Sequence, residues 1–231
     1  MARQIIAMGG GVLVGDSENR SLERYVIAAS NKDRPRALFI GTASGDDAAR
    51  LNVFYEAYGA LGCATAHLPF FRRTAQDIRA LVLGQDIVHV GGGNTRTMFA
   101  VWREWGLTDI LQEAYERGIV LCGSSAGSIC WYEEGVTDSV AGDLGLIKGL
   151  GLLPGSHCPH YDAEPQRRPA YQRFVAAGTV SPGIAADDGV ALHYVDGKLE
   201  AIVRARPNVT AYKLERDGDG VRETRLEARD L

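Results

Sequence analysis

The strongest constraint on the fold is a regular alternation of short apolar segments with helical patterns along the first 130 residues. The segments with the apolar, β-branched composition of buried strands are 4–8, 37–41, 65–68, 86–90 and 120–123. The intervening helical patterns cover 23–29, 48–61, 74–83, 94–105 and 107–116, and Thr74 is the expected N-cap of the third helix. This alternation predicts an α/β fold, doubly wound, with a mostly parallel sheet covered by helices on both faces.

The last third of the chain has a different pattern. A helix from about Pro169 to Ala177 precedes short strand-like segments separated by Asp-Gly and Pro-Asn turns. These segments are 190–195, 201–204, 210–214 and 222–226. We expect them to form a β-rich C-terminal edge of the same sheet. The chain shows no linker, repeat or low-complexity tract, so we expect one domain over residues 1–231.

Composition and charge exclude several classes of protein. The chain has 231 residues, 45% of them apolar, which is enough for one large core. A net charge of −4 without a basic cluster argues against nucleic-acid or membrane-surface binding. The four cysteines show no Cys-x-x-Cys spacing, and no apolar run has the length of a signal sequence or a membrane span. We therefore expect a cytoplasmic protein, and the sequence leaves a homodimer open.

The strand-like segment at 120–123 leads directly into Gly123-Ser-Ser-Ala-Gly127 and then into an apolar, helix-compatible stretch. Gly-x-Ser-x-Gly between a strand and a helix is the pattern of a nucleophile elbow, in which a sharp turn exposes the serine hydroxyl. Here the serine is Ser125, and the amide of Ala126 is the expected oxyanion donor. The same five residues also occur as an ordinary tight turn, and this alternative stays open.

A nucleophilic serine needs a base, and His160 is the strongest candidate among the five histidines because Pro159 stiffens its approach. His157 reads instead as a surface turn residue. Core positions are expected for His67 and His89, and no motif surrounds His193. The acids between Ser125 and His160 that are able to orient the imidazole are Glu133, Glu134, Asp138 and Asp143. The residues alone do not choose among them.

Two glycine triplets follow predicted strands. Gly91-Gly92-Gly93 lets the backbone approach a ligand, and Asn94 or Thr95 is suited to cap the helix that follows. No Gly-Lys-Ser/Thr sequence is present, which excludes a P-loop. Gly9-Gly10-Gly11 reads as a structural turn or as part of the rim of the site. A non-catalytic nucleotide- or phosphate-binding protein that uses both triplets is a rival hypothesis.

Together, Val90-Gly-Gly-Gly-Asn-Thr95, Gly123-Ser-Ser-Ala-Gly127 and Pro159-His160-Tyr161, in that order, resemble the peptidase E family. This is serine peptidase family S51, the group of aspartyl dipeptidases and cyanophycinases, and the resemblance runs from the first strand to about residue 192. It implies a fold like that of class I glutamine amidotransferases, with Ser125 as nucleophile and His160 as base. It also implies an oxyanion hole built from the amides of Gly92 and Ala126.

For the acid of the triad, the resemblance favours Asp138, counted back from the histidine, with Glu133 as the alternative. It further implies a small peptide substrate with an N-terminal aspartate (Asp-X dipeptides), bound by an arginine, and no metal or organic cofactor. Arg168 is the first candidate for that arginine and Arg167 the second. Asn94 is placed with Arg168 as a substrate-binding residue. The alternative is a cyanophycinase-like hydrolase of aspartyl-arginine peptides, although this chain has few insertions from which to build a long groove.

Overall fold

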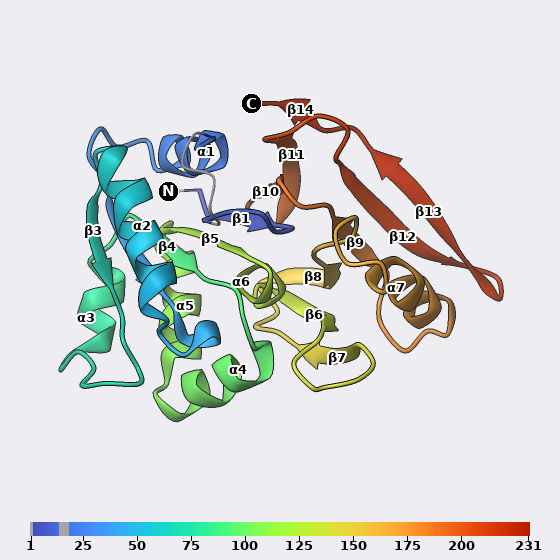
Figure 1. Cartoon of the computed structure of the whole chain (residues 1–231), viewed down its shortest axis with the longest axis horizontal. Coiled ribbons are helices and arrows are strands. Elements are labelled where there is room, and N and C mark those ends of the chain that lie inside the picture. Colours follow the sequence, from blue (N-terminus) through green and yellow to red (C-terminus); the bar gives the residue numbers. More distant parts are fainter. Residues whose placement is uncertain (1, 14–18) are drawn as a thin grey trace.

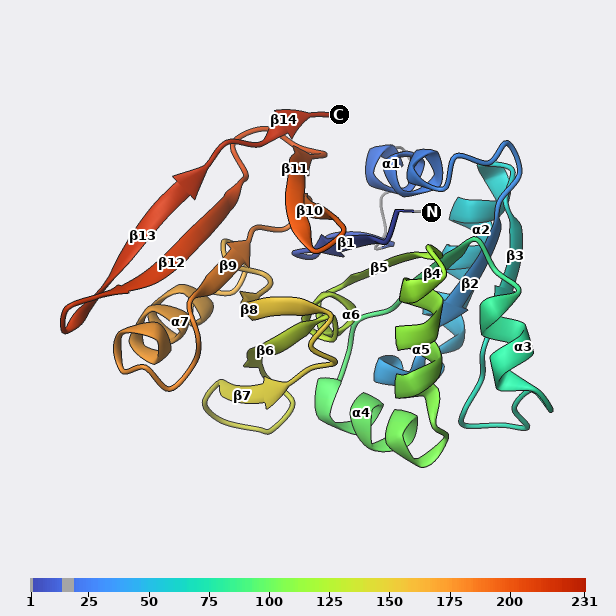
Figure 2. The same cartoon turned by 180° about the vertical axis from the view of Figure 1, so that it is seen from behind.

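A computed structural model describes residues 2–13 and 19–231, which form two β-sheets flanked by helices (Figures 1 and 2). The first sheet has eight strands in the order β14-β11-β10-β1-β5-β4-β2-β3. Its strands are β1 (Gln4–Met8), β2 (Arg36–Ile40), β3 (Ala64–His67), β4 (Ile87–Val90), β5 (Val120–Ser124), β10 (Val190–Val195), β11 (Lys198–Arg204) and β14 (Arg229–Asp230). Strands β1, β5, β4, β2 and β3 are parallel, and β10 joins β1 in antiparallel pairing.

Helices cover both faces of the parallel strands, so the predicted doubly wound α/β architecture is confirmed. The helices are α1 (Ser21–Ala29), α2 (Ala48–Ala60), α3 (Ile78–Leu83), α4 (Thr95–Glu104), α5 (Leu107–Glu116), α6 (Ala126–Ile129) and α7 (Arg167–Ala176), with a 3₁₀ turn η1 (Thr42–Ser44). On one face Val26 of α1 and Phe54 of α2 are buried in a single cluster. On the other face Trp102 of α4 and Leu111 of α5 are buried in another. No helix in the described part of the chain is both long and apolar enough to span a bilayer.

The second sheet corrects the expectation of a single sheet with a β-rich edge. It has six strands in the order β13-β12-β9-β8-β6-β7. These strands are β6 (Tyr132–Thr137), β7 (Gly145–Lys148), β8 (Leu153–Cys158), β9 (Gly183–Ala186), β12 (Ala211–Asp217) and β13 (Gly220–Leu226). Strands β10 and β11 do extend the first sheet, but β12 pairs with β9 and carries β13 with it. The hydrophobic patterns of the sequence do not predict strands β6 to β9, because glycines interrupt the apolar runs at positions where neighbouring backbones lie in contact. A Cβ on Gly183 of β9, for example, would lie 2.0 Å from the Ser156 carbonyl oxygen of β8.

The start of α3 also differs from the expectation. The helix begins at Ile78, and its N-cap is Asp77, whose side chain accepts a 2.8 Å hydrogen bond from the Ala80 amide. Thr74 lies before the helix, and its hydroxyl is buried without a hydrogen-bond partner in the described structure. Aspartate is a better N-cap than threonine, which explains the later start.

Strand ends from both sheets meet at one place and position the candidate site. In the first sheet, Met8 of β1 lies opposite Ser124 of β5, and Val90 of β4 lies opposite Gly123. The glycine triplets and Ser125 therefore leave neighbouring strands at the same edge, where ligands bind in such sheets. In the second sheet β8 and β9 are parallel neighbours, and they end just before His160 and Asp188 respectively.

Candidate active site

Ser125 occupies a sharp turn between β5 and α6, with φ 57° and ψ −120°. A non-glycine residue in this region is strained, typically by about 1–3 kcal/mol, and such strain is concentrated at functional sites. The flanking glycines are required by packing. A Cβ on Gly123 would lie 2.4 Å from the Gly127 carbonyl oxygen, and one on Gly127 would lie 2.0 Å from the Val90 carbonyl oxygen. The turn therefore has the geometry of a nucleophile elbow.

A buried polar chain supports the back of this elbow. The Ser128 hydroxyl donates to the Ser125 carbonyl oxygen (2.7 Å) and lies 3.1 Å from Nε2 of His157. The expectation that His157 is a surface residue is wrong: its side chain is fully buried and stacks on Tyr132 at 4.7 Å between ring centroids. Burial lowers the pKa of His157 to about 3, and its Nδ1–H donates to the Ile184 carbonyl oxygen at 2.8 Å. His157 is thus a neutral structural residue beneath the Ser125 turn.

His160 is held at the start of its turn with φ 55°, and its amide donates to the Gly9 carbonyl oxygen at 3.0 Å. Its Nδ1 lies 2.7 Å from Oδ1 of Asp188. Because a carboxylate accepts, the imidazole carries its proton on Nδ1 and leaves Nε2 free to act as a base. The His160 and Asp188 side chains pack against Gly10, where a Cβ would lie 2.1 Å from Asp188 Oδ1 and 2.4 Å from His160 Nδ1. The first glycine triplet is therefore part of the site.

The acid next to His160 differs from both sequence candidates. Asp138 is on the loop after β6 with its side chain 60% exposed, and its nearest charged partner is the Arg167 guanidinium at 3.7 Å. Glu133 accepts a 2.7 Å hydrogen bond from the Gly155 amide. The expectation that Asp138 or Glu133 orients the imidazole is therefore not met in this structure. Asp188 lies outside the segment between Ser125 and His160 from which the sequence candidates come; the Asp-Asp-Gly turn just before the predicted strand at 190–195 was the available signal.

The two halves of the site share a cavity of about 390 Å³, within the usual range for small-molecule sites. Its wall includes Ser125, His160, Gly92, Asn94, Asp138 and Arg50. No hydrogen bond joins Ser125 to His160 among the described residues, as is common before substrate tightens such contacts. Nor does the Gly92 or Ala126 amide donate one within residues 2–13 and 19–231. The Gly92 backbone lies close to Ser125, since a Cβ there would be 3.1 Å from Ser125 Cβ.

The candidate binding residues separate into those inside and outside this cavity. Asn94 lines it, but its side chain caps α4 by accepting from the Thr97 amide (2.9 Å) and donates to the Ser139 carbonyl oxygen (3.0 Å). Arg168 does not line it. Its guanidinium bonds Glu223 and lies over the ring of Tyr212, 4.9 Å from the centroid.

The other sequence candidate for substrate recognition, Arg167, is buried, with its guanidinium bound to Glu164 (2.7 Å) and to the Val136 carbonyl oxygen (3.0 Å). The cation that does line the cavity is Arg50, in the first turn of α2, which sequence reasoning missed. Arg50 forms no ion pair within the described ranges. Among these residues, no cluster of three or more His, Cys, Asp or Glu side chains is arranged to hold a metal ion.

Comparison with known proteins places this architecture in a family. The model of peptidase family S51 matches residues 5–202. A relative from Bacillus subtilis (strain 168), described as "Uncharacterized peptidase YgaJ", is 46% identical over 212 residues, covering 92% of each chain. In fold, the chain is similar to a crystallised peptidase from an acI-B1 Actinobacterium (TM-score 0.76, 19% identity, covering 99% of this chain and 95% of that one). It is also similar to a putative peptidase E protein from Listeria monocytogenes EGD-e (TM-score 0.61, 16% identity, covering 98% and 100%). The chain belongs to peptidase family S51, as the resemblance of its three motifs to peptidase E implies.

Proposed function

We propose that this protein is a serine peptidase that hydrolyses small peptides with an N-terminal aspartate, using Ser125, His160 and Asp188. The observation that carries the proposal is the 2.7 Å hydrogen bond between Asp188 and His160, because His160 lines the same cavity as the strained Ser125. A nucleophile, a base with a free Nε2 and an acid that fixes the tautomer are the three parts that acyl transfer requires.

In the proposed mechanism, Ser125 Oγ attacks the scissile carbonyl carbon while His160 Nε2 accepts the hydroxyl proton. The Gly92 and Ala126 amides donate to the oxyanion of the tetrahedral intermediate. When this intermediate collapses, the C–N bond breaks and His160 returns the proton to the leaving amine. A water molecule then attacks the acyl-enzyme while His160 takes its proton; the bond between the acyl carbon and Ser125 Oγ breaks, His160 returns the proton to Ser125 Oγ, and the acid product leaves. Asp188 holds the imidazole and stabilises its charged form throughout.

Substrate recognition follows from the charges on the cavity wall. Arg50 is suited to bind the aspartyl carboxylate, because a guanidinium offers two parallel donors to such a group. Asp138, with its side chain 60% exposed on the same wall, is suited to accept the N-terminal ammonium of an unblocked peptide. This assignment gives Arg50 the role that the sequence resemblance gave to Arg168, which is engaged with Glu223.

The test is hydrolysis of Asp-Leu, Glu-Leu, Asn-Leu and Ala-Leu by the wild type and by Ser125→Ala. We expect cleavage of Asp-Leu that is lost in Ser125→Ala, while Ser124→Ala keeps most of the activity. Arg50→Gln should abolish the preference for Asp-Leu over Ala-Leu, whereas Arg34→Gln, an exposed arginine away from the cavity, should retain it.

Three outcomes would count against parts of the proposal. An essential Ser124 with a dispensable Ser125 would overturn the elbow assignment. An unchanged preference in Arg50→Gln would overturn the binding role of Arg50. Cleavage of an aspartyl-arginine polymer without cleavage of Asp-Leu would favour the cyanophycinase-like alternative over a dipeptidase.

A further inference from the structure

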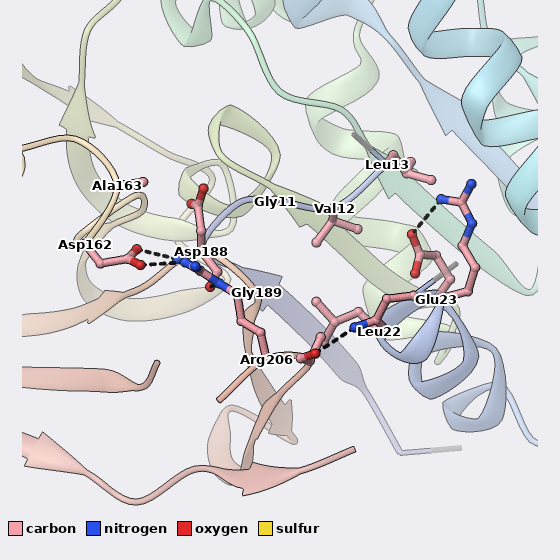
Figure 3. A pocket seen from close by; sticks show the side chains of 13 residues that line it. Gly11, Val12, Leu13, Leu22, Glu23, Asp162, Ala163, Asp188, Gly189 and Arg206 are labelled. Atoms are coloured by element: carbon pink, nitrogen blue, oxygen red, sulfur yellow. Dashed lines mark hydrogen bonds and ion pairs between the residues drawn. The ribbon is translucent and has the colours of Figure 1, made fainter. Parts of the chain in front are cut away.

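A second cavity, of about 440 Å³, is lined in part by Asp162, Asp188 and Arg206 (Figure 3). These three residues bond to one another in a closed arrangement. We infer that Asp162 and Arg206 are positioning residues that fix the main chain of Asp188 and thereby aim its carboxylate at His160. This inference rests on the proposed function, because it assigns Asp188 to the triad.

The arrangement uses both oxygens of Asp162. Oδ1 accepts a 2.7 Å hydrogen bond from the Asp188 amide, and Oδ2 accepts a 2.5 Å hydrogen bond from an Arg206 terminal nitrogen. The Arg206 Nε–H then donates to the Asp188 carbonyl oxygen at 2.8 Å. Both main-chain groups of Asp188 are therefore held by one ion pair, which we call the Asp162–Arg206 brace.

The neighbours of Asp188 do not need such support. The Asp187 amide donates to the Thr210 carbonyl oxygen (3.0 Å), and the Gly189 amide donates to the Gly10 carbonyl oxygen (2.9 Å). These are backbone bonds within the fold. Asp188 itself, on the short turn between β9 and β10, has side chains as the partners of its N–H and C=O groups. The orientation of Asp188 consequently depends on the side chains of Asp162 and Arg206, and mutation of either one tests this dependence.

The brace also links the acid to the base. Asp162 is two residues after His160, and the Tyr161 amide between them donates to the Ala186 carbonyl oxygen at the end of β9 (3.2 Å). The turn that carries the imidazole thus carries the carboxylate that holds Asp188. The base and the acid are therefore anchored to the same turn, which helps to hold their 2.7 Å contact.

Because the brace is partly exposed, its loss should affect catalysis more than the stability of the fold. The side chains of Asp162 and Arg206 are 31% and 48% exposed, so their ion pair contributes little to the free energy of unfolding. A misplacement of the triad acid, in contrast, acts directly on the proton transfer, and errors of about 1 Å in such sites cost about 100-fold in rate. Loss of the brace should therefore slow the reaction without lowering the melting temperature appreciably.

The experiment compares Arg206→Met, Arg206→Lys, Asp162→Ala and Asp162→Asn with the wild type. The matched control is Arg204→Met, because Arg204, at the end of β11 and two residues before Arg206, forms a similar ion pair with Asp230 of β14, at 2.6 Å, without a hydrogen bond to Asp188. The readouts are kcat and KM for the best dipeptide, the rate of fluorophosphonate labelling of Ser125, the low-field NMR signal of the His160 Nδ1–H proton, and the melting temperature.

We expect Arg206→Met and Asp162→Ala to lower kcat and the labelling rate by roughly 10- to 100-fold while KM changes by less than about 2-fold. The His160 Nδ1–H signal should shift or broaden in both variants. Arg206→Lys should recover part of the rate because its ammonium still has donors for Asp162 and the Asp188 carbonyl. Asp162→Asn should be intermediate, since its amide oxygen still accepts from the Asp188 amide but its NH₂ group faces Arg206. Arg204→Met should match the wild type.

The outcomes distinguish the two proposals. In one outcome the wild type is labelled, while Arg206→Met is labelled at the same rate and shows the same His160 signal. That result would overturn the brace but not the triad. A wild type that neither labels nor cleaves any peptide would overturn the proposed function. In that case the His160 signal still tests the brace, because an unchanged signal in Arg206→Met and Asp162→Ala would refute it independently of activity.

Discussion

The two halves of the site are built in opposite ways. The elbow around Ser125 is local: residues 123–127 supply the strained turn and the two glycines on which it depends. The corner around His160 is assembled from Gly10, His160, Asp188 and Arg206, which span most of the chain. The elbow depends on the absence of side chains at two positions, whereas the corner depends on Gly10 and also on hydrogen bonds made by specific side chains. A local motif can therefore be present while the acid of the proposed triad comes from a distant part of the chain.

The two halves also differ in the charge that they bury. The elbow is supported by His157, whose pKa burial lowers to about 3. The corner contains Asp187, which is 3% exposed and accepts from the Thr210 amide at 2.9 Å. Burial, with a further contribution from nearby Asp162, raises the pKa of Asp187 to about 6. Burial thus keeps His157 behind the elbow neutral, and it disfavours the charged form of Asp187 next to the corner.

The largest effect that tests this comparison is expected from the acid of the corner. Asp188→Asn should lower kcat by about 10³- to 10⁴-fold, because an amide able to donate to Nδ1 favours the wrong tautomer of the base. Asp138→Asn should act mainly on KM for peptides with a free amino terminus, since its carboxylate is not bonded to His160. Steady-state kinetics on the dipeptide panel, with melting temperatures for both variants, measure the difference.

The control for this pair is Asp143→Asn, an exposed carboxylate in the same loop as Asp138, which should behave as the wild type. The reverse result, a collapse of kcat in Asp138→Asn with an active Asp188→Asn, would return the acid to the position that the family resemblance implied. It would also mean that the His160–Asp188 contact is replaced during the reaction.

This contrast explains how much the sequence could predict. The alternating segments specify the parallel half of the first sheet, and the motif at 123–127 specifies the elbow, because both signals lie in contiguous residues. The pairing of β12 with β9 and the contact of His160 with Asp188 depend on tertiary packing, which leaves no local periodicity. Arg50 was missed for the same reason: only the fold brings the first turn of α2 to the cavity.

A smaller effect should distinguish Gly10, which packs against side chains, from Gly127, which packs against backbone. Gly10→Ala places a Cβ within 2.4 Å of both His160 Nδ1 and Asp188 Oδ1, so we expect the pair to shift and kcat to fall by about 100-fold while the protein remains folded. Gly127→Ala meets backbone instead, 2.0 Å from the Val90 carbonyl oxygen, and should lower the melting temperature strongly. Activity and thermal unfolding of the two variants make the comparison.

The matched control is Gly59→Ala in α2, where a Cβ meets nothing within 4 Å. This change should leave activity unaltered and should stabilise the protein slightly, by about 0.5–1 kcal/mol, because alanine favours the helix. A fully active Gly10→Ala would show that the corner tolerates displacement, and the close approach of Gly10 would then have no catalytic importance.

The smallest effect should come from the buried charge of the corner. Asp187 ionises near pH 3.8 when unfolded and near pH 6 when folded, so from about pH 4 to pH 6 the unfolded chain loses a proton that the folded chain retains. The free energy of unfolding therefore falls as the pH rises through this window, by at most about 3 kcal/mol, and the cost is fully present above pH 6.

Asp187→Asn keeps an acceptor for the Thr210 amide but removes this cost. Its melting temperature should exceed that of the wild type by a few degrees at pH 7.5, and the difference should shrink toward pH 4. A difference that is constant from pH 4.5 to pH 7.5 would mean that Asp187 titrates alike in the folded and unfolded states, and the contrast in buried charge between elbow and corner would then be lost.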